Sequence, residues 1–103
     1  SERRRDRLEI DSKVRNLLDK LIKKMPSVVI NYLLQYVYTV SLPESERSKL
    51  ISMIMRAGSQ LTEGNTKRAE GYVRLAVEKL TNHNIPLSPI LVQLVDMYLL
   101  KMV

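Results

Sequence analysis

Lysines on one face of a predicted helix are the residues of this sequence best suited to a chemical role. Lys13, Lys20 and Lys24 follow one another at intervals of seven and four residues, which places them near one line of a helix. Cations in a line on long side chains can bind the phosphates of a nucleic acid. A solvated helix face has the same appearance, and Glu9 and Asp19 dilute the positive charge. The residues predicted to contact nucleic acid are Arg3, Arg4, Arg5, Lys13, Lys20, Lys23, Lys24, Lys67 and Arg68.

A second candidate site is the segment 64–68, where a glycine turn leads into a predicted helix. Lys67 and Arg68 stand in its first turn, where positive charge opposes the helix dipole at a cost of about 0.3 kcal/mol or more. Unpaired N–H groups beside two cations would bind an anion, which predicts a phosphate or nucleotide site. The alternative is that this electrostatic cost is small and screened by salt, and that no ligand binds. The sequence lacks the pattern of a Walker loop. The predicted site consists of Asn65, Thr66, Lys67 and Arg68.

A third candidate is a frame of tyrosines, Tyr32, Tyr36 and Tyr38, around a polar strip of the helix predicted at 26–40. Their rings could stack on bases or on a nucleotide ring. Tyrosines at such borders more often pack the ring against the core and leave the hydroxyl in water, and we favour that interpretation.

Catalytic and metal-binding patterns were not found. His83 is the only histidine, the chain has no cysteine, and no carboxylate pair lies beside His83. The residue types needed for a zinc site or a nucleophilic triad are therefore not brought together by the sequence. We predict that the chain is not an enzyme by itself, that it has no cofactor or metal, and that it can belong to a larger enzyme.

The chain of 103 residues has a net charge of +6 and 45% hydrophobic residues, a composition typical of a basic globular protein. The positive excess lies in the two flanks of a neutral middle, which suits nucleic acid, an anionic membrane surface or an acidic partner. No apolar run reaches the roughly 18–20 residues that span a bilayer, so we expect no membrane partner. Together with the lack of cysteine, this favours a cytoplasmic or nuclear location.

Helical periodicity predicts an all-α fold, a compact bundle of about five helices around a central apolar helix at 26–40. One broad face of that helix is formed by Val29, Ile30, Leu33, Leu34, Val37 and Val40. Pro26 suits a first helical turn, so the preceding helix is expected to end before it. That preceding helix is expected to bury a face formed by Ile10, Val14, Leu17, Leu18, Leu21 and Met25.

Three further helices are predicted, from Pro43 to about Leu61, from Asn65 or Thr66 to the polar run after Leu80, and from Pro89 onward. Gly64 is predicted to cap the first of these in a left-handed conformation. Residues 1–9 are expected to be a basic arm or a frayed helix start, and residues 10–103 a single domain. Because the last helix is apolar nearly all round, we expect this domain to be excised from a larger protein.

The sequence is compatible with two functions. The first is a nucleic-acid-binding accessory domain of a replication, primase or transcription protein, with DNA favoured over RNA and a nucleotide as a possible second ligand. The second is a protein-interaction module that docks a partner helix, or further domains of the same polypeptide, through the predicted helices at 43–61 and 89–103. In the second case the basic charge would serve solubility or an acidic partner.

Overall fold

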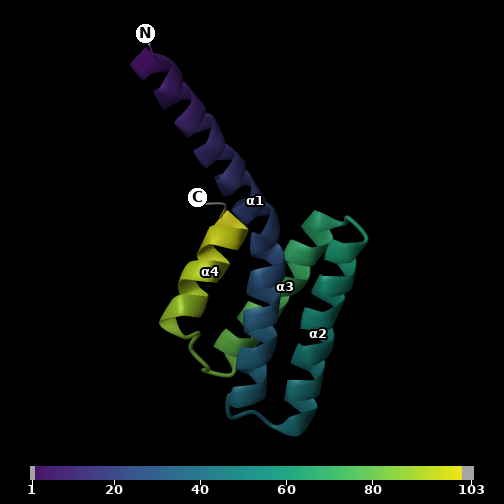
Figure 1. Cartoon of the computed structure of the whole chain (residues 1–103). Helices are drawn as coiled ribbons and strands as arrows, with labels where there is room; N and C mark the ends of the chain where they lie inside the picture. Colours follow the sequence, from purple (N-terminus) through teal and green to yellow (C-terminus); the bar gives the residue numbers. More distant parts are fainter. Residues whose placement is uncertain (1, 101–103) are drawn as a thin grey trace.

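In a computed structural model that describes residues 2–100, the chain folds into four α-helices, and no strand occurs in that range. The second half of α1 and the other three helices form a body, and the first half of α1 projects from it (Figure 1). The all-α class is confirmed, whereas the expected count of five helices is one too many. The helices are α1 (Glu2–Thr39), α2 (Glu44–Thr62), α3 (Thr66–Asn82) and α4 (Pro89–Leu100).

Helix α1 runs without a break through Pro26, where the sequence predicted a boundary between two helices. Proline lacks the N–H that would bond to the carbonyl of Ile22, and it costs about 3 kcal/mol inside a helix. The predicted boundary was wrong because a proline only favours a helix end. Here the segment after it is held by the core, and the segment before it continues the same helix outside the core. The helix changes direction where it reaches the body (Figure 1).

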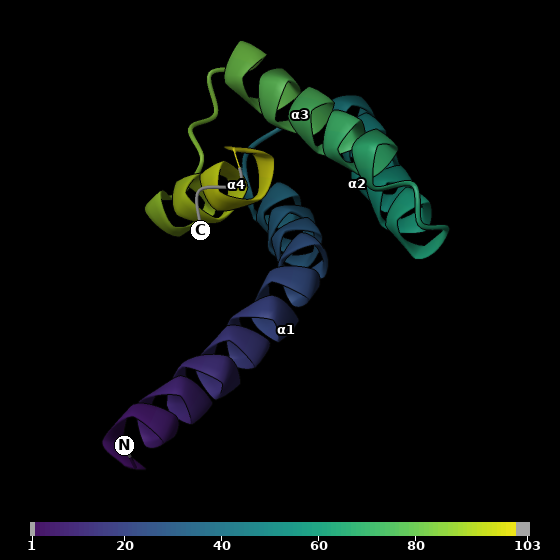
Figure 2. The same ribbon diagram turned by 90° about the horizontal axis from the view of Figure 1, so that it is seen from above.

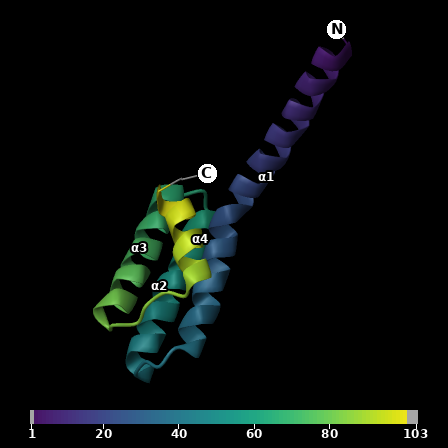
Figure 3. The same cartoon turned by 90° about the vertical axis from the view of Figure 1, so that its left-hand side faces the viewer.

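Residues 2–24 of α1, which we call the arm, lie outside the body, and all of them are exposed (Figures 1 and 3). The molecule is therefore 64 Å long, with a radius of gyration of 17.3 Å against about 13 Å for a compact domain of this length. Residues 2–9, predicted as an arm or a frayed start, are helical. The apolar face predicted to be buried before Pro26 is exposed, and only Met25 packs against the core.

The core lies where α1, α2, α3 and α4 meet below the arm. The second half of α1 contributes Val29, Ile30, Leu33 and Val37 of the predicted face. Leu34 and Val40, predicted on the same face, are partly buried against this core. Helix α1 packs against α2 on one side and α4 on the other, and α3 packs against α2 (Figure 2). The other helices contribute Leu50, Ile54, Ala57, Ala69, Val73, Ala76, Leu80, Leu91, Val95 and Tyr98.

The turn after α2 brings the start of α3 beside the base of the arm. Gly64 has a φ of 85°, which confirms the predicted left-handed cap. Its N–H donates to Leu61 O at 3.1 Å, and the N–H of Asn65 donates to Gln60 O at 2.8 Å. This pair of bonds is a Schellman motif, which satisfies the last carbonyls of α2 and reverses the chain.

Candidate functional site: the arm and the pocket at its base

Large apolar side chains form a continuous exposed row along the arm. Six of them, 43 to 61% exposed, lie at the 3- and 4-residue spacings that place side chains on one helix face. An isolated exposed leucine needs no explanation, but a row of this length normally packs against another surface. We call it the apolar stripe; its members are Ile10, Val14, Leu17, Leu18, Leu21 and Ile22.

The predicted lysines Lys13, Lys20 and Lys24 follow one edge of this stripe, and we call them the lysine edge. Helical spacing of about 100° per residue places them on one line beside the apolar side chains. Within residues 2–100, none of the three takes part in an ion pair. The structure thus brings three predicted cations together on an accessible face.

The other predicted cations are more scattered. Arg3, Arg4 and Arg5 occupy the first turn of α1 and, like Lys23, are exposed. Successive residues point about 100° apart on a helix, so the three arginines do not face one side. By the same spacing, Arg5 and Lys23 lie on the face opposite the apolar stripe.

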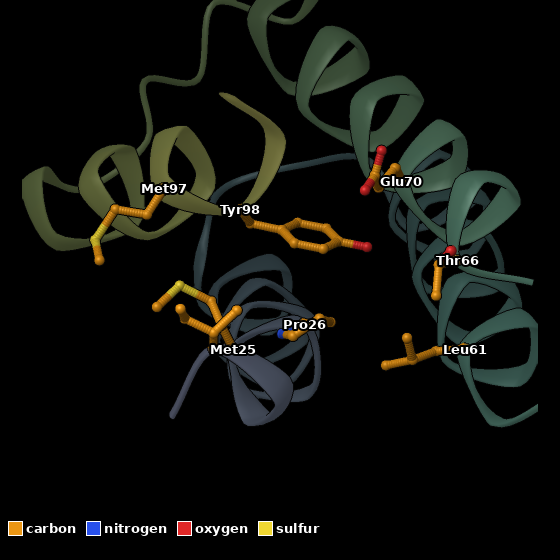
Figure 4. Close-up of a pocket in the computed structure, with 8 residues that line it drawn as sticks. Met25, Pro26, Leu61, Thr66, Glu70, Met97 and Tyr98 are labelled. Atoms are coloured by element: carbon orange, nitrogen blue, oxygen red, sulfur yellow. The ribbon is translucent and has the colours of Figure 1, made fainter. Parts of the chain in front are cut away.

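A pocket of about 410 Å³ lies at the base of the arm, between α1, the end of α2, the start of α3 and the end of α4 (Figure 4). We call it the base pocket. Ile22 belongs both to the apolar stripe and to this pocket, so the two apolar surfaces are continuous. The residues that line the pocket are Ile22, Met25, Pro26, Leu61, Thr66, Glu70, Met97 and Tyr98.

Tyr98 carries the most unusual polar group of the base pocket. Its side chain points across the pocket from α4 toward Glu70 and Thr66 on α3 (Figure 4). The residue is only 6% exposed, and among the described residues its hydroxyl has no hydrogen-bond partner. Burial raises the pKa of this phenol, and the negative charge of Glu70 raises it further. A buried hydroxyl without a partner is destabilising, so a ligand that bonds to it would gain binding energy.

The segment predicted to bind phosphate or nucleotide gains no further support from its geometry. The N–H of Asn65 is used in the Schellman motif, and its side-chain Nδ2 donates to Gln60 Oε1 at 2.9 Å. Thr66 lines the base pocket together with Glu70, whose carboxylate disfavours an anion there. Lys67 and Arg68 are exposed beside the turn, so the anion site stays a prediction.

The structure gathers two of the three tyrosines predicted as a stacking frame. Tyr32 and Tyr36 line a shallow cavity of about 180 Å³ near the start of α4, and Tyr38 is exposed away from it. The hydroxyl of Tyr36 donates to the backbone carbonyl of Pro86. Tyr36 therefore joins α1 to the loop before α4 through its hydroxyl, and a stacking role for the three tyrosines stays a prediction.

His83 lies in a cluster of charges that joins α2 to α3, away from the base pocket. Its Nε2 is 3.3 Å from Glu46 Oε2, and the Nζ atoms of Lys49 and Lys79 are 3.5 and 3.7 Å from the same carboxylate. Lys49, then Lys79, and a hydrogen bond from His83 lower the pKa of Glu46. This cluster is a structural link between helices and presents no open site.

Metal-ligand clusters and membrane-spanning helices are both absent from residues 2–100. No group of three or more potential metal ligands occurs there. None of the helices in that range combines the length and the apolar character that crossing a membrane requires.

Comparison with known proteins identifies no relative of this chain. No protein-family model, no curated protein sequence and no solved structure matches it.

The base pocket was not predicted from the sequence. Its walls come from four helices, and the residues that form it are distant in the chain. The apolar stripe was recognised as a pattern but was assigned to the core. Its exposure depends on the continuation of α1 through Pro26, which local spacing does not reveal.

Proposed function

We propose that this chain is a protein-interaction module that docks a partner helix along its arm. The observation that carries the proposal is the apolar stripe, six large side chains exposed on one face of a helix that leaves the body. An amphipathic helix of this kind is a standard surface for helix–helix recognition. Each apolar side chain transferred from water to an interface contributes about 25 cal/mol per Å² of area buried.

The sequence suggested protein docking through the third and last of its predicted helices, which correspond to α2 and α4. The inward faces of these helices are used in the core, through Leu50 and Ile54 of α2 and Leu91 and Val95 of α4. The apolar stripe of the arm, in contrast, is exposed and does not belong to the core. The docking surface is therefore proposed on the arm.

A designed peptide tests this proposal without knowledge of the natural partner. The probe is a three-heptad helix with leucine at the a and d positions and uncharged polar residues elsewhere. We expect it to bind the chain in isothermal titration calorimetry and to shift the amide NMR signals of the arm. The double variant Leu17→Gln, Leu21→Gln should lose this binding and keep its helical circular dichroism.

The matched control is Met55→Gln, Ile90→Gln, because both side chains are about as exposed as those of the stripe but lie on the body. This control should bind the peptide as the unchanged chain does. Absence of binding by the unchanged chain, or an equal loss in the control, would refute the arm as the docking surface.

A second candidate function is binding of nucleic acid, favoured by the lysine edge. Lys13, Lys20 and Lys24 are exposed in one line and free of ion pairs within the described part of the chain. Such a line is suited to phosphates along one strand or groove. DNA and RNA present the same backbone charge, and DNA is our preferred ligand on the basis of the sequence.

Fluorescence anisotropy with single-stranded DNA, duplex DNA and RNA tests this second function. The variant Lys13→Gln, Lys20→Gln should bind more weakly and lower the slope of log K against log salt by about 0.9 per lysine on duplex DNA. The control Lys49→Gln, Arg56→Gln makes the same change in net charge on α2. Equal slopes for all three proteins would exclude the lysine edge from the contact.

A further inference from the structure

We infer that the partner of the arm is an acidic amphipathic helix, anchored at one end by an apolar side chain in the base pocket. This inference rests on the proposed function, which assigns docking to the arm, and it adds the charge of the partner and the place of its anchor. Three features carry it: the register of the apolar stripe, the position of the lysine edge, and the continuity of the stripe with the pocket.

The register of the stripe is that of a coiled-coil seam. Ile10, Val14, Leu17 and Leu21 follow one another at intervals of four, three and four residues, which is the spacing of d and a positions in a heptad. All four are exposed, and all lie in one unbroken helix. A partner helix would pack side by side with the arm, with its own apolar residues between those of the stripe.

The lysines along one edge of this seam favour an acidic partner, and the opposite edge holds Asp11 and Leu18 at its e positions. Lys13 and Lys20 each precede an a-position residue and so occupy g positions, which face the flanking residues of a packed helix. Residues 2–25 hold nine basic and five acidic side chains, an excess of four positive charges. A partner with glutamate or aspartate along its facing edge would pair with these lysines, and a basic partner would be repelled.

The same charges oppose pairing of the arm with a second copy of itself. In a parallel pair, Arg7 and Lys24 occupy seam positions and would each face the same residue of the other copy. In an antiparallel pair, Lys13 would face Lys20 across the seam. Like charges in either arrangement weaken self-association, so a different, acidic helix is the better occupant.

The base pocket supplies an anchor point beside the end of the seam. Leu18, Ile22 and Met25, at positions i, i+4 and i+7, flank the seam and lead along α1 from the stripe to the pocket wall. A volume of about 410 Å³ accommodates one large apolar side chain of a partner helix.

The experiment uses three peptides of the same three-heptad design, with glutamate, glutamine or lysine at the e and g positions. Binding to the unchanged chain should decrease in the order glutamate, glutamine, lysine. The double variant Lys13→Glu, Lys20→Glu should weaken binding of the glutamate peptide by about two- to tenfold and strengthen that of the lysine peptide. The control Arg5→Glu, Lys23→Glu changes the charge of the arm equally on its opposite face and should keep the original order.

The anchor is tested in the peptide instead of the protein, so that folding of the chain is not disturbed. Alanine replaces the first leucine of the glutamate peptide in one variant and the last leucine in another. One of these two variants should bind more weakly and lose the NMR shifts at Thr66 and Glu70, and the other should keep these shifts. If both variants bind equally weakly and both keep the shifts at Thr66 and Glu70, the anchor is excluded.

The outcomes separate this inference from the proposed function. If all three peptides bind equally, docking holds and the acidic partner is refuted. If none of the three peptides binds, the docking function itself is refuted. If only oligonucleotides bind, and the Lys13→Glu, Lys20→Glu variant loses that binding, the lysine edge serves nucleic acid and the inference is overturned.

Discussion

Two leucines of the same helix provide the sharpest test of the structure. Leu33 is fully buried in the core, and Leu21, twelve residues earlier in α1, is 61% exposed on the arm. The same substitution to alanine should therefore have very different effects on the free energy of unfolding. The comparison holds the helix, the residue type and the replacement constant, and it varies only the packing.

The expected magnitudes follow from burial. Leu33→Ala removes apolar atoms from a closed core and leaves a cavity, which costs about 2–5 kcal/mol. A domain of this size has a total stability of about 5–15 kcal/mol, so the loss is large and easily measured. Leu21→Ala removes a side chain that already contacts water, and leucine and alanine have similar helix propensities. Its effect should be within about 0.5 kcal/mol of zero.

Urea unfolding followed by circular dichroism at two protein concentrations measures both changes. A cost of about 2 kcal/mol or more for Leu21→Ala would mean that the arm is buried in solution, contrary to the structure. Dependence of that cost on protein concentration would identify pairing with another copy, and independence would identify folding back onto the body. A cost below about 0.5 kcal/mol for Leu33→Ala would place that residue outside the core.

Three other predictions concern stability. Pro26→Ala should raise the free energy of unfolding by about 1–2 kcal/mol in urea titrations, because it restores the N–H within α1. A lower free energy of unfolding would mean that packing of the proline ring in the pocket wall stabilises the fold more than the missing N–H destabilises it. Tyr98→Phe should be neutral or stabilise the free chain by up to about 1 kcal/mol in the same assay, because it removes a buried hydroxyl without a partner; a clear loss would reveal a bond to that hydroxyl. The folded state holds the pKa of Glu46 below its usual 4.5, so the unfolded state binds more protons and stability should fall as pH is lowered through that region. Glu46→Gln should remove this part of the pH dependence in thermal melts between pH 3 and pH 6, and an unchanged dependence would contradict the role of Lys49 and Lys79.

Local pattern was sufficient for much of the fold. The spacing of Val29, Ile30, Leu33 and Val37 predicted the central core face, because buried positions on a helix recur with its period. The left-handed conformation of Gly64 was also predictable, since a glycine after an apolar helix is the preferred cap. These features depend on residues within a few positions of one another, and the sequence by itself determines them.

The tertiary structure alone decided where the first apolar face lies. Whether Pro26 ends a helix or lies within one depends on the packing of the segment that follows it, and this packing involves α2 and α4. Continuation through Pro26 carries the stripe out of the body, so a face with the pattern of a core is left in water. The base pocket and the unpartnered hydroxyl of Tyr98 likewise require residues from α1, α2, α3 and α4 to meet, and contacts over such separations leave no local signal in the sequence.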